Sequence, residues 1–366
     1  MAPCLKLFQF AEASNKAASW RQHCLALFFQ PFLHTLSHRS MLHTSSTGGL
    51  LNLSRLRAKT NSKRVLIREL LYANDAALVV HSEMHLQSLC ERFVKACIDF
   101  SMTINLKKTV VMSLGTSIPS PILVNVSLLN VVDKFFYLGS VVNCLNNLDE
   151  EINQQIGKAS INFGRLSSRV WKNHHFAIKL KIKVYTACIL SVLLYSSETW
   201  CTYPRQENRL NAFHFRCLRS ILDVSWRDHV PNSAILNLTG SYDLTTILRQ
   251  RRLRWLGHVH RIEDGRLPKD IIYGEFYNAP RRTVRPKLRY KDVIKRDIAG
   301  FHISPRSWET FAADRNRWSA SLSFGYWLSA TSYAVKMKKR WAHSPQRRDG
   351  PWWWWWHVVL HVARKG

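Results

Sequence analysis

Hydrophobic and polar positions follow one rhythm in the first part of this chain and another after residue 142. Between residues 65 and 80, two short apolar runs rich in strand formers flank the polar pair Asn74 and Asp75. This pattern predicts a β-hairpin with the polar pair in its turn. Apolar runs at 103–112 and 131–142, the second interrupted by Gly139, predict further strands.

Helical periodicity begins after Ser82 and returns from residue 152 onward. Apolar residues three and four positions apart share one helical face, and in the first helix these are Leu86, Leu89, Phe93, Cys97 and Phe100. The same steps recur from 152 to 170, and apolar helices are predicted at 180–195 and 207–222. We therefore expect an α+β fold in which a small sheet precedes a mainly helical part.

The two ends of the chain show no sustained period. Residues 1–47 lack one, and beyond Trp318 it fades into a tail with five consecutive tryptophans at 352–356. No face of a helix or strand accounts for such a run, so we expect both ends to be disordered. We therefore divide the chain into five parts. Residues 1–47 form an N-terminal segment without periodicity, 48–142 a part of mixed strands and helix, and 143–248 a helical part. Residues 249–318 form a basic part, and 319–366 a tail without periodicity.

The charge balance points to a polyanionic partner. The chain has 53 Lys and Arg against 24 Asp and Glu, a formal net charge of +29. Nucleic acid is the commonest partner of such a protein. An anionic membrane surface is the alternative, but it usually requires an amphipathic or lipidated anchor. No apolar run reaches 18 residues, so we expect RNA or DNA as partner, with no membrane and no small-molecule substrate.

The positive charge is concentrated at residues 249–296, which hold 15 Lys and Arg against five Asp and Glu. Trp255 and Tyr290 are predicted to stack on bases. The alternative is that Trp255 lies in the core and the arginines face water. Phosphate contacts carry no sequence information directly, so non-specific binding is expected. The predicted phosphate contacts are Arg251, Arg252, Arg254, Arg281, Arg282 and Arg285.

The eight cysteines contain no C-x-x-C pair and no zinc-finger spacing. Cys90, Cys97 and Cys188 fall on apolar helical faces, and we interpret them as buried free thiols. His258 and His260 have no further ligands at zinc spacing, so structural roles are favoured for both.

Eight blocks follow one another between Gly48 and Trp318. They are LNLSRLRAKT, VLIRELLYANDAALVVHSE, FSMTINLKKTVVM, FFYLGSVV, LLYSSETW, FHFRCLRSILDVSWRD, RRLRWLGHVHRIEDGRLPKD and RYKDVIKRD. In this order they resemble the C-terminal half of reverse transcriptases from LINE-type retrotransposons, which lack long terminal repeats. The resemblance implies a partial polymerase palm of hairpin and helix, followed by a helical thumb-like region and a basic C-terminal region.

The resemblance implies a damaged catalytic site. In the family, two adjacent aspartates of the palm hairpin and one earlier carboxylate hold two magnesium ions. Asp75 matches the second aspartate and is the remaining candidate metal ligand, whereas Asn74 stands at the first. The 47 residues before Gly48 contain Glu12 and no Asp. We therefore expect no bound magnesium, although the family requires it.

Two further blocks carry candidate site residues. Lys108 matches a lysine that protonates the pyrophosphate leaving group in polymerases, and the alternative is an ordinary solvated lysine. Tyr137, Leu138 and Gly139 match the primer grip, and the alternative is simple packing of a short hairpin.

These features predict a catalytically inactive remnant of an RNA-directed DNA polymerase that retains non-specific nucleic-acid binding. Two alternatives stay open: a polymerase completed by a second polypeptide, and a translated pseudogene product without a selected role. The nucleus or cytoplasm is the expected location, with a mitochondrial leader in residues 1–47 as the alternative. We also expect residues 48–142 to be less stable than 150–225, because a partial palm leaves sheet edges uncovered.

Overall fold

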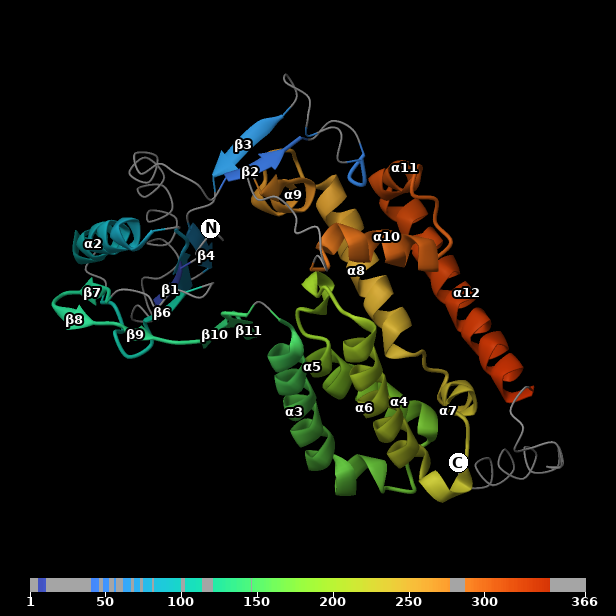
Figure 1. The fold of residues 1–366 in the computed structure, drawn as a ribbon. Coiled ribbons are helices and arrows are strands. Elements are labelled where there is room, and N and C mark those ends of the chain that lie inside the picture. Colours follow the sequence, from blue (N-terminus) through green and yellow to red (C-terminus); the bar gives the residue numbers. More distant parts are fainter. Residues whose placement is uncertain are drawn as a thin grey trace. The chain divides into compact units, whose positions relative to one another are not determined.

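The computed structural model describes residues 6–10, 41–45, 49–52, 56, 62–66, 69–72, 75–80, 82–99, 103–113, 121–145, 147–276 and 287–342 (Figure 1). The chain forms two compact units. The first, the sheet unit, comprises Met1–Asn147 and Glu263–Pro286. The second, the helical unit, comprises Leu148–Ile262 and Lys287–Gly366. The predicted combination of small sheets followed by helices is confirmed.

The sheet unit contains short strands and two helices among its described residues. Its helices are α2 (Glu83–Asp99) and α9 (Leu267–Tyr273). Its strands are β1 (Lys6–Phe10), β2 (Met41–Thr44), β3 (Lys63–Leu66), β4 (Glu69–Tyr72), β5 (Asp75–Leu78), β6 (Val110–Ser113), β7 (Leu123–Val124), β8 (Ser127–Leu128), β9 (Asn130–Val131), β10 (Lys134–Tyr137), β11 (Ser140–Asn143) and β12 (Glu275–Phe276).

The main sheet has the strand order β4-β5-β1-β6-β9. β4 and β5 form the predicted hairpin, but Asp75, predicted in the turn, is the first residue of β5 and pairs with Tyr72. β1 lies between β5 and β6 and is antiparallel to both. The predicted first strand is wrong at its start, because Val65 and Leu66 belong to β3, which pairs with β2 in a separate sheet.

Two other strand predictions are corrected by turn chemistry. Residues 105–108 form a turn and not a strand, because the Asn105 side-chain oxygen accepts from the backbone N–H of Lys107 at 3.1 Å and of Lys108 at 3.3 Å. The run at 131–142 includes the β10–β11 hairpin, whose turn residues Leu138 and Gly139 have φ of 49° and 82°. Two positive φ values match the turns that best fit a two-residue hairpin.

The sheet unit packs its apolar side chains on both faces of β5. Successive strand residues point to opposite faces, so Ala76 and Leu78 join the cluster that contains the buried side of α2. Ala77 and Val79 join a second cluster that contains Phe135 of β10. The predicted helical face of Leu86, Leu89, Phe93 and Cys97 is confirmed as buried, and Phe100 lies outside the described residues.

The helical unit is built from α-helices with short π-helical and 3-10 turns. Its elements are α3 (Asp149–Arg165), η2 (Ser167–Trp171), α4 (Ile178–Tyr185), η3 (Thr186–Leu190), α5 (Ser191–Leu193), η4 (Ser197–Thr199), α6 (Pro204–Leu222), η5 (Trp226–Asp228), α7 (Asn232–Thr239), α8 (Leu244–Arg261), α10 (Tyr290–Gly300), α11 (Trp308–Ala313) and α12 (Arg315–Ala342).

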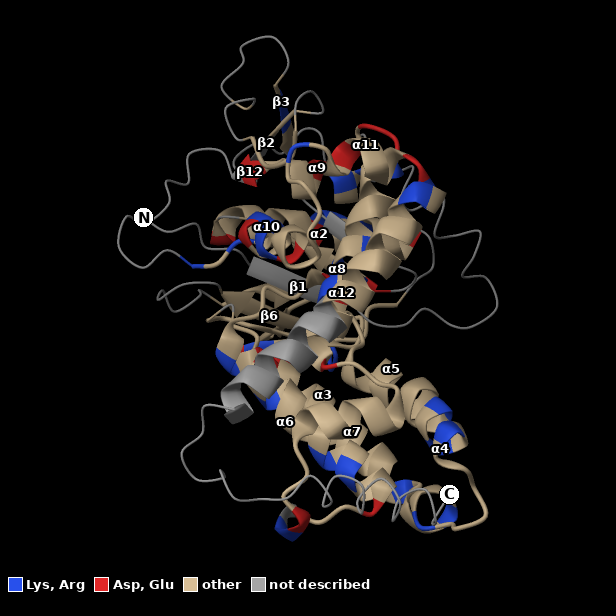
Figure 2. Cartoon of the chain, turned by 90° about the vertical axis from the view of Figure 1, so that its right-hand side faces the viewer, with Lys and Arg blue, Asp and Glu red and all other residues tan. Residues whose placement is uncertain are grey.

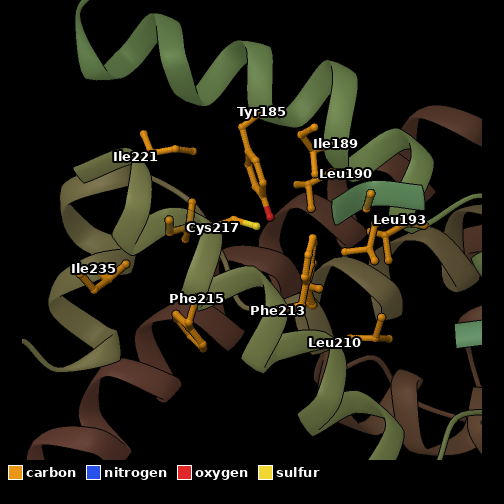
Figure 3. Close-up of a cluster of buried hydrophobic side chains, with 14 of the residues drawn as sticks. Tyr185, Ile189, Leu190, Leu193, Leu210, Phe213, Phe215, Cys217, Ile221 and Ile235 are labelled. Carbon is orange, nitrogen blue, oxygen red and sulfur yellow. The ribbon is translucent and has the colours of Figure 1, made fainter. Parts of the chain in front are cut away.

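One core cluster joins α3, α4, η3, α5, α6 and α7 (Figure 3). Tyr185, Ile189 and Leu193 recur every four residues and are buried in it. Cys188 is exposed on the other side, so its predicted burial is wrong, while Cys90 and Cys97 are buried as predicted. Apolar neighbours such as Ile189 and Leu190 led to the prediction that Cys188 is buried, but the buried face of the helix is narrower and does not include it.

Two expected boundaries differ from the structure. The boundary at 248/249 falls inside α8, and the region 249–318 is divided between the two units. The expected disorder beyond residue 319 is wrong for the described part of the tail, because α12 continues to Ala342. Trp318 and Leu322 on that helix are buried, which anchors its first turns to the helical unit.

Candidate nucleic-acid interface and remnant hairpin site

The β4–β5 hairpin places Asp75 at the start of β5, where its side chain is half-buried. Asn74 lies outside the described residues. Tyr137 at the end of β10 is close enough for the Asp75 carboxylate to act on it: burial raises the pKa of the Tyr137 phenol, and the Asp75 charge raises it further. The structure thus brings together two candidate residues that lie 62 positions apart in the sequence.

The other candidates of this unit lie in turns. Leu138 and Gly139 form the two-residue turn that follows Tyr137. Lys108 is exposed in the turn before β6, and its backbone N–H donates to the Asn105 carbonyl oxygen at 3.1 Å. These positions are compatible with the alternative in which the primer-grip-like residues pack a hairpin.

Among the described residues, the side chains near Asp75 do not supply the ligands of a pair of magnesium ions. Each Mg²⁺ prefers octahedral coordination by several oxygen ligands, with carboxylates carrying the charge. Within the described residues, no three His, Cys, Asp or Glu side chains lie together as ligands for one metal. An amide at position 74 in the sequence contributes no negative charge.

Arg252, a predicted phosphate contact, is instead an interior residue of the helical unit. Its side chain is 0% exposed, and its Nε and Nη2 donate to the Asp297 carboxylate at 2.6 and 3.2 Å. Its Nη1 donates to Thr202 Oγ1 at 3.3 Å. The prediction for Arg252 is therefore corrected: α8 turns this residue into the protein, where no phosphate reaches it.

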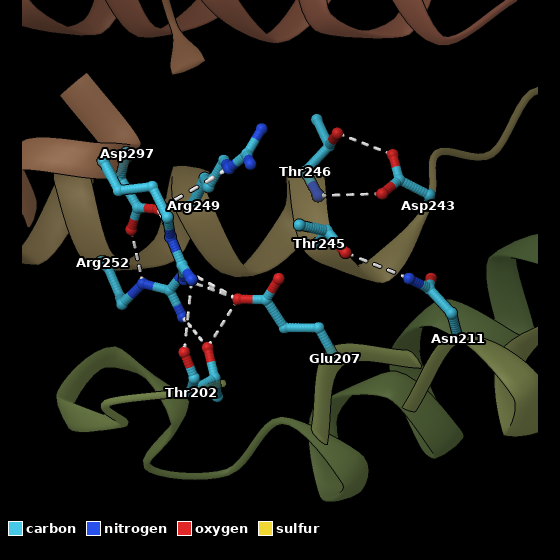
Figure 4. A network of polar contacts seen from close by, with 10 residues as sticks. Thr202, Glu207, Asn211, Asp243, Thr245, Thr246, Arg249, Arg252 and Asp297 are labelled. Atoms are coloured by element: carbon cyan, nitrogen blue, oxygen red, sulfur yellow. Dashed lines mark hydrogen bonds and ion pairs between the residues drawn. The ribbon is translucent and has the colours of Figure 1, made fainter. Parts of the chain in front are cut away.

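A polar network surrounds that ion pair and joins α6, α8 and α10 (Figure 4). Arg296 Nη2 donates to Glu207 Oε1 at 2.6 Å, and Thr202 Oγ1 donates to the same oxygen at 2.7 Å. Arg249 Nε lies 3.6 Å from Asp297 Oδ1. Three guanidinium groups thus share two carboxylates, so three of the 15 cations in the basic segment are paired within the fold.

The remaining described candidates of the basic segment are half-buried or exposed. Arg251 donates to Glu198 at 3.1 Å and to the Leu194 carbonyl at 2.8 Å. Trp255 is half-buried and meets the Tyr290 ring edge-on at 5.8 Å, which supports the core alternative for Trp255. Arg254 is exposed. Arg281, Arg282 and Arg285 lie outside the described residues.

Sequence reasoning passed over another basic stretch. Residues 152–197 contain seven Lys and Arg and no Asp or Glu. A count of cations alone favours 249–296, because 15 exceeds seven. The absence of acidic residues was the available signal, since a cation without an acidic neighbour keeps its charge for a ligand.

Comparison with known proteins supports a transposon origin. No protein-family model matches the chain. A transposon-derived protein of Caenorhabditis elegans is 25% identical over 267 residues, which span 69% of this chain and 94% of that protein.

Among the described residues, no helix is both long enough and apolar enough to cross a membrane.

Proposed function

We propose that this chain is a remnant of the reverse transcriptase of a LINE-type retrotransposon, no longer active as a polymerase, which binds RNA and DNA without sequence preference. The observation that carries the proposal is the hairpin with Asp75, whose strand β5 packs through Ala77 in the same cluster as Tyr137. The family's order of blocks would place the metal-binding hairpin next to the primer grip. The similarity to a transposon-derived protein supports the same origin.

The proposed loss of polymerase activity rests on the ligands near the hairpin. Asn74 replaces an acidic residue, and Asp75 is the one matched carboxylate. β5 lies between β4 and β1 in the sheet. β1 (KLFQF) contains no carboxylate, and the carboxylate residue of β4, Glu69, pairs with Leu78 at the other end of the hairpin from Asp75. Two divalent ions need more negative charge than one aspartate provides.

Primer extension on an RNA template tests this loss. We expect no extension by the parent protein or by Asn74→Asp, with either Mg²⁺ or Mn²⁺, because one added carboxylate does not complete the ligand set. Asn74→Asp combined with Asp75→Ala is the matched control for contaminating polymerase. Extension by Asn74→Asp that disappears in this control would overturn the proposed inactivity.

Fluorescence anisotropy with labelled oligonucleotides of random sequence tests the binding. The net charge of +29 supports binding through counterion release, so log affinity is expected to fall linearly with log salt concentration. RNA and DNA of different sequences are expected to bind alike. Absence of binding at low salt would overturn this half of the proposal.

A further inference from the structure

The helical unit has a basic corner where α3 turns into α4, at residues 165–183. It lies within the acid-free stretch 152–197. The basic residues of α4 are all lysines, and the helix carries no acidic residue (Figure 2). The corner contains the π-helical turn η2, and π-helical turns are frequent at functional sites.

A buried tryptophan, Trp171, packs the corner against the protein interior. Trp171 stacks on Phe163 with ring centroids 4.9 Å apart, and its Nε1 donates to the Phe163 carbonyl at 2.8 Å. The buried Lys181 ammonium donates to the Trp171 carbonyl at 2.8 Å. These contacts fix the end of η2 to α3 and α4, so the side chains outside are displayed from a firm base.

Five exposed cations and one exposed aromatic ring come from the end of α3, η2, the connection to α4 and α4 itself. Phe176 is 38% exposed and stands two residues before α4. Lys179 and Lys183 are four residues apart on α4 and therefore share a helical face, roughly 6 Å apart along the axis. Within the described part of the chain, the five form no ion pair with a carboxylate. They are the exposed residues Arg165, Arg169, Lys172, Lys179 and Lys183.

From this arrangement we infer that the α3–α4 corner is a single-stranded nucleic-acid interface, with the five cations on phosphates and Phe176 stacked on a base. The inference rests on the proposed function and assigns its binding surface, which the buried Arg252 of α8 does not provide. Cationic grooves with exposed aromatic rings bind single strands because every base has a stacking face.

A membrane surface fits the corner less well. Insertion at a bilayer surface needs a broad apolar helical face. On α4, Ile178 and Ile182 pack against the protein core, and Lys181 is buried. Phe176 and Leu180, 45% exposed, supply too little apolar area for such a face.

The test compares two triple charge reversals by anisotropy with a random single-stranded RNA at several salt concentrations. The corner variant is Arg169→Glu, Lys172→Glu and Lys179→Glu. The control is Arg306→Glu, Arg315→Glu and Arg317→Glu, which alters three exposed arginines elsewhere in the same unit and lowers the net charge equally. Each single-strand phosphate contact contributes about 0.7 to the slope. We expect the corner variant to lose roughly 1 to 2 units of slope and the control to keep the parental slope.

Phe176→Ala tests stacking, with Phe324→Ala as the matched control because Phe324 is an exposed ring on α12. Loss of one base stack is expected to weaken single-strand binding roughly 5- to 160-fold. Duplex binding should weaken less. Equal binding by both phenylalanine variants would overturn the stacking contact.

The outcomes separate the two proposals. No binding by the parent would overturn the proposed function, and the corner assignment with it. Binding by the parent with an unchanged slope in the corner variant, or with equal losses in both triple variants, would overturn the corner alone. Stronger capture by phosphatidylserine vesicles than by RNA would also overturn it. Circular dichroism checks folding, and neutralisation of the same three residues to Gln replaces any reversal that unfolds.

Discussion

Removal of the Asp297 carboxylate tests the interior of the helical unit most directly. Asp297 is 0% exposed and pairs with Arg252, which is also 0% exposed. Asp297→Ala leaves that guanidinium buried without its main counter-charge. Loss of one partner of a buried ion pair typically costs about 3–5 kcal/mol. Since Glu207 Oε1 remains 4.0 Å from Arg252 Nη2, we expect a loss near the lower end, about 3 kcal/mol.

Two control variants separate this effect from a general loss of charge. Arg205→Ala breaks an ion pair with Asp149 in which the arginine is 75% exposed, and such pairs contribute about 1 kcal/mol or less. Arg252→Met combined with Asp297→Leu removes both charges of the buried pair. Because neither charge is then left uncompensated, the double variant is expected to recover most of the stability.

Urea denaturation measures these differences. A chain of two compact units does not necessarily unfold in a single two-state step, so two probes are compared. Far-UV ellipticity follows the helical unit, and tryptophan fluorescence provides the second probe. A cost for Asp297→Ala below about 1 kcal/mol, equal to that of Arg205→Ala, would refute the buried pair. If Asp297→Ala kept full stability and bound RNA more strongly, Arg252 would be a surface residue accessible to RNA and not a buried one.

Two further predictions concern the same unit. Gly257→Ala should cost about 1–3 kcal/mol because its Cβ would collide with the Trp318 indole, whereas Gly157→Ala on α3 meets open space and should gain up to about 1 kcal/mol; thermal unfolding of both checks this. Burial lowers the pKa of His214 to about 4, so the folded state favours the neutral ring. The contribution of the neutral His214 ring to the free energy of unfolding should be complete above pH 6.5 and fall by about 3 kcal/mol toward pH 4. His214→Gln should remove this pH dependence in urea titrations.

Local patterns were sufficient where one element determines the outcome. The spacing of Leu86, Leu89, Phe93 and Cys97 predicted the buried face of α2, because side chains three and four apart share a side of any helix. The polar pair between apolar runs predicted the β4–β5 hairpin, because turn chemistry is a property of neighbouring residues. The formal net charge of +29 is a sum over the residues and is independent of the fold.

The sequence alone determined the helix after Ser82, the helical stretches from 152 to 222, the hairpin that carries Asp75 and the strongly basic character of the chain, but not α12, which occupies residues expected to be disordered. Tertiary structure decided which cations remain available to a ligand. Arg252 stands in the most basic segment, yet it is buried because Asp297, 45 residues away, meets it from α10. Arg169 and Lys179 stand in a less basic segment and remain exposed, whereas Trp171 and Lys181, each two residues further along the chain, are buried. Charge is a property of the residue, whereas its availability depends on partners that only folding brings near.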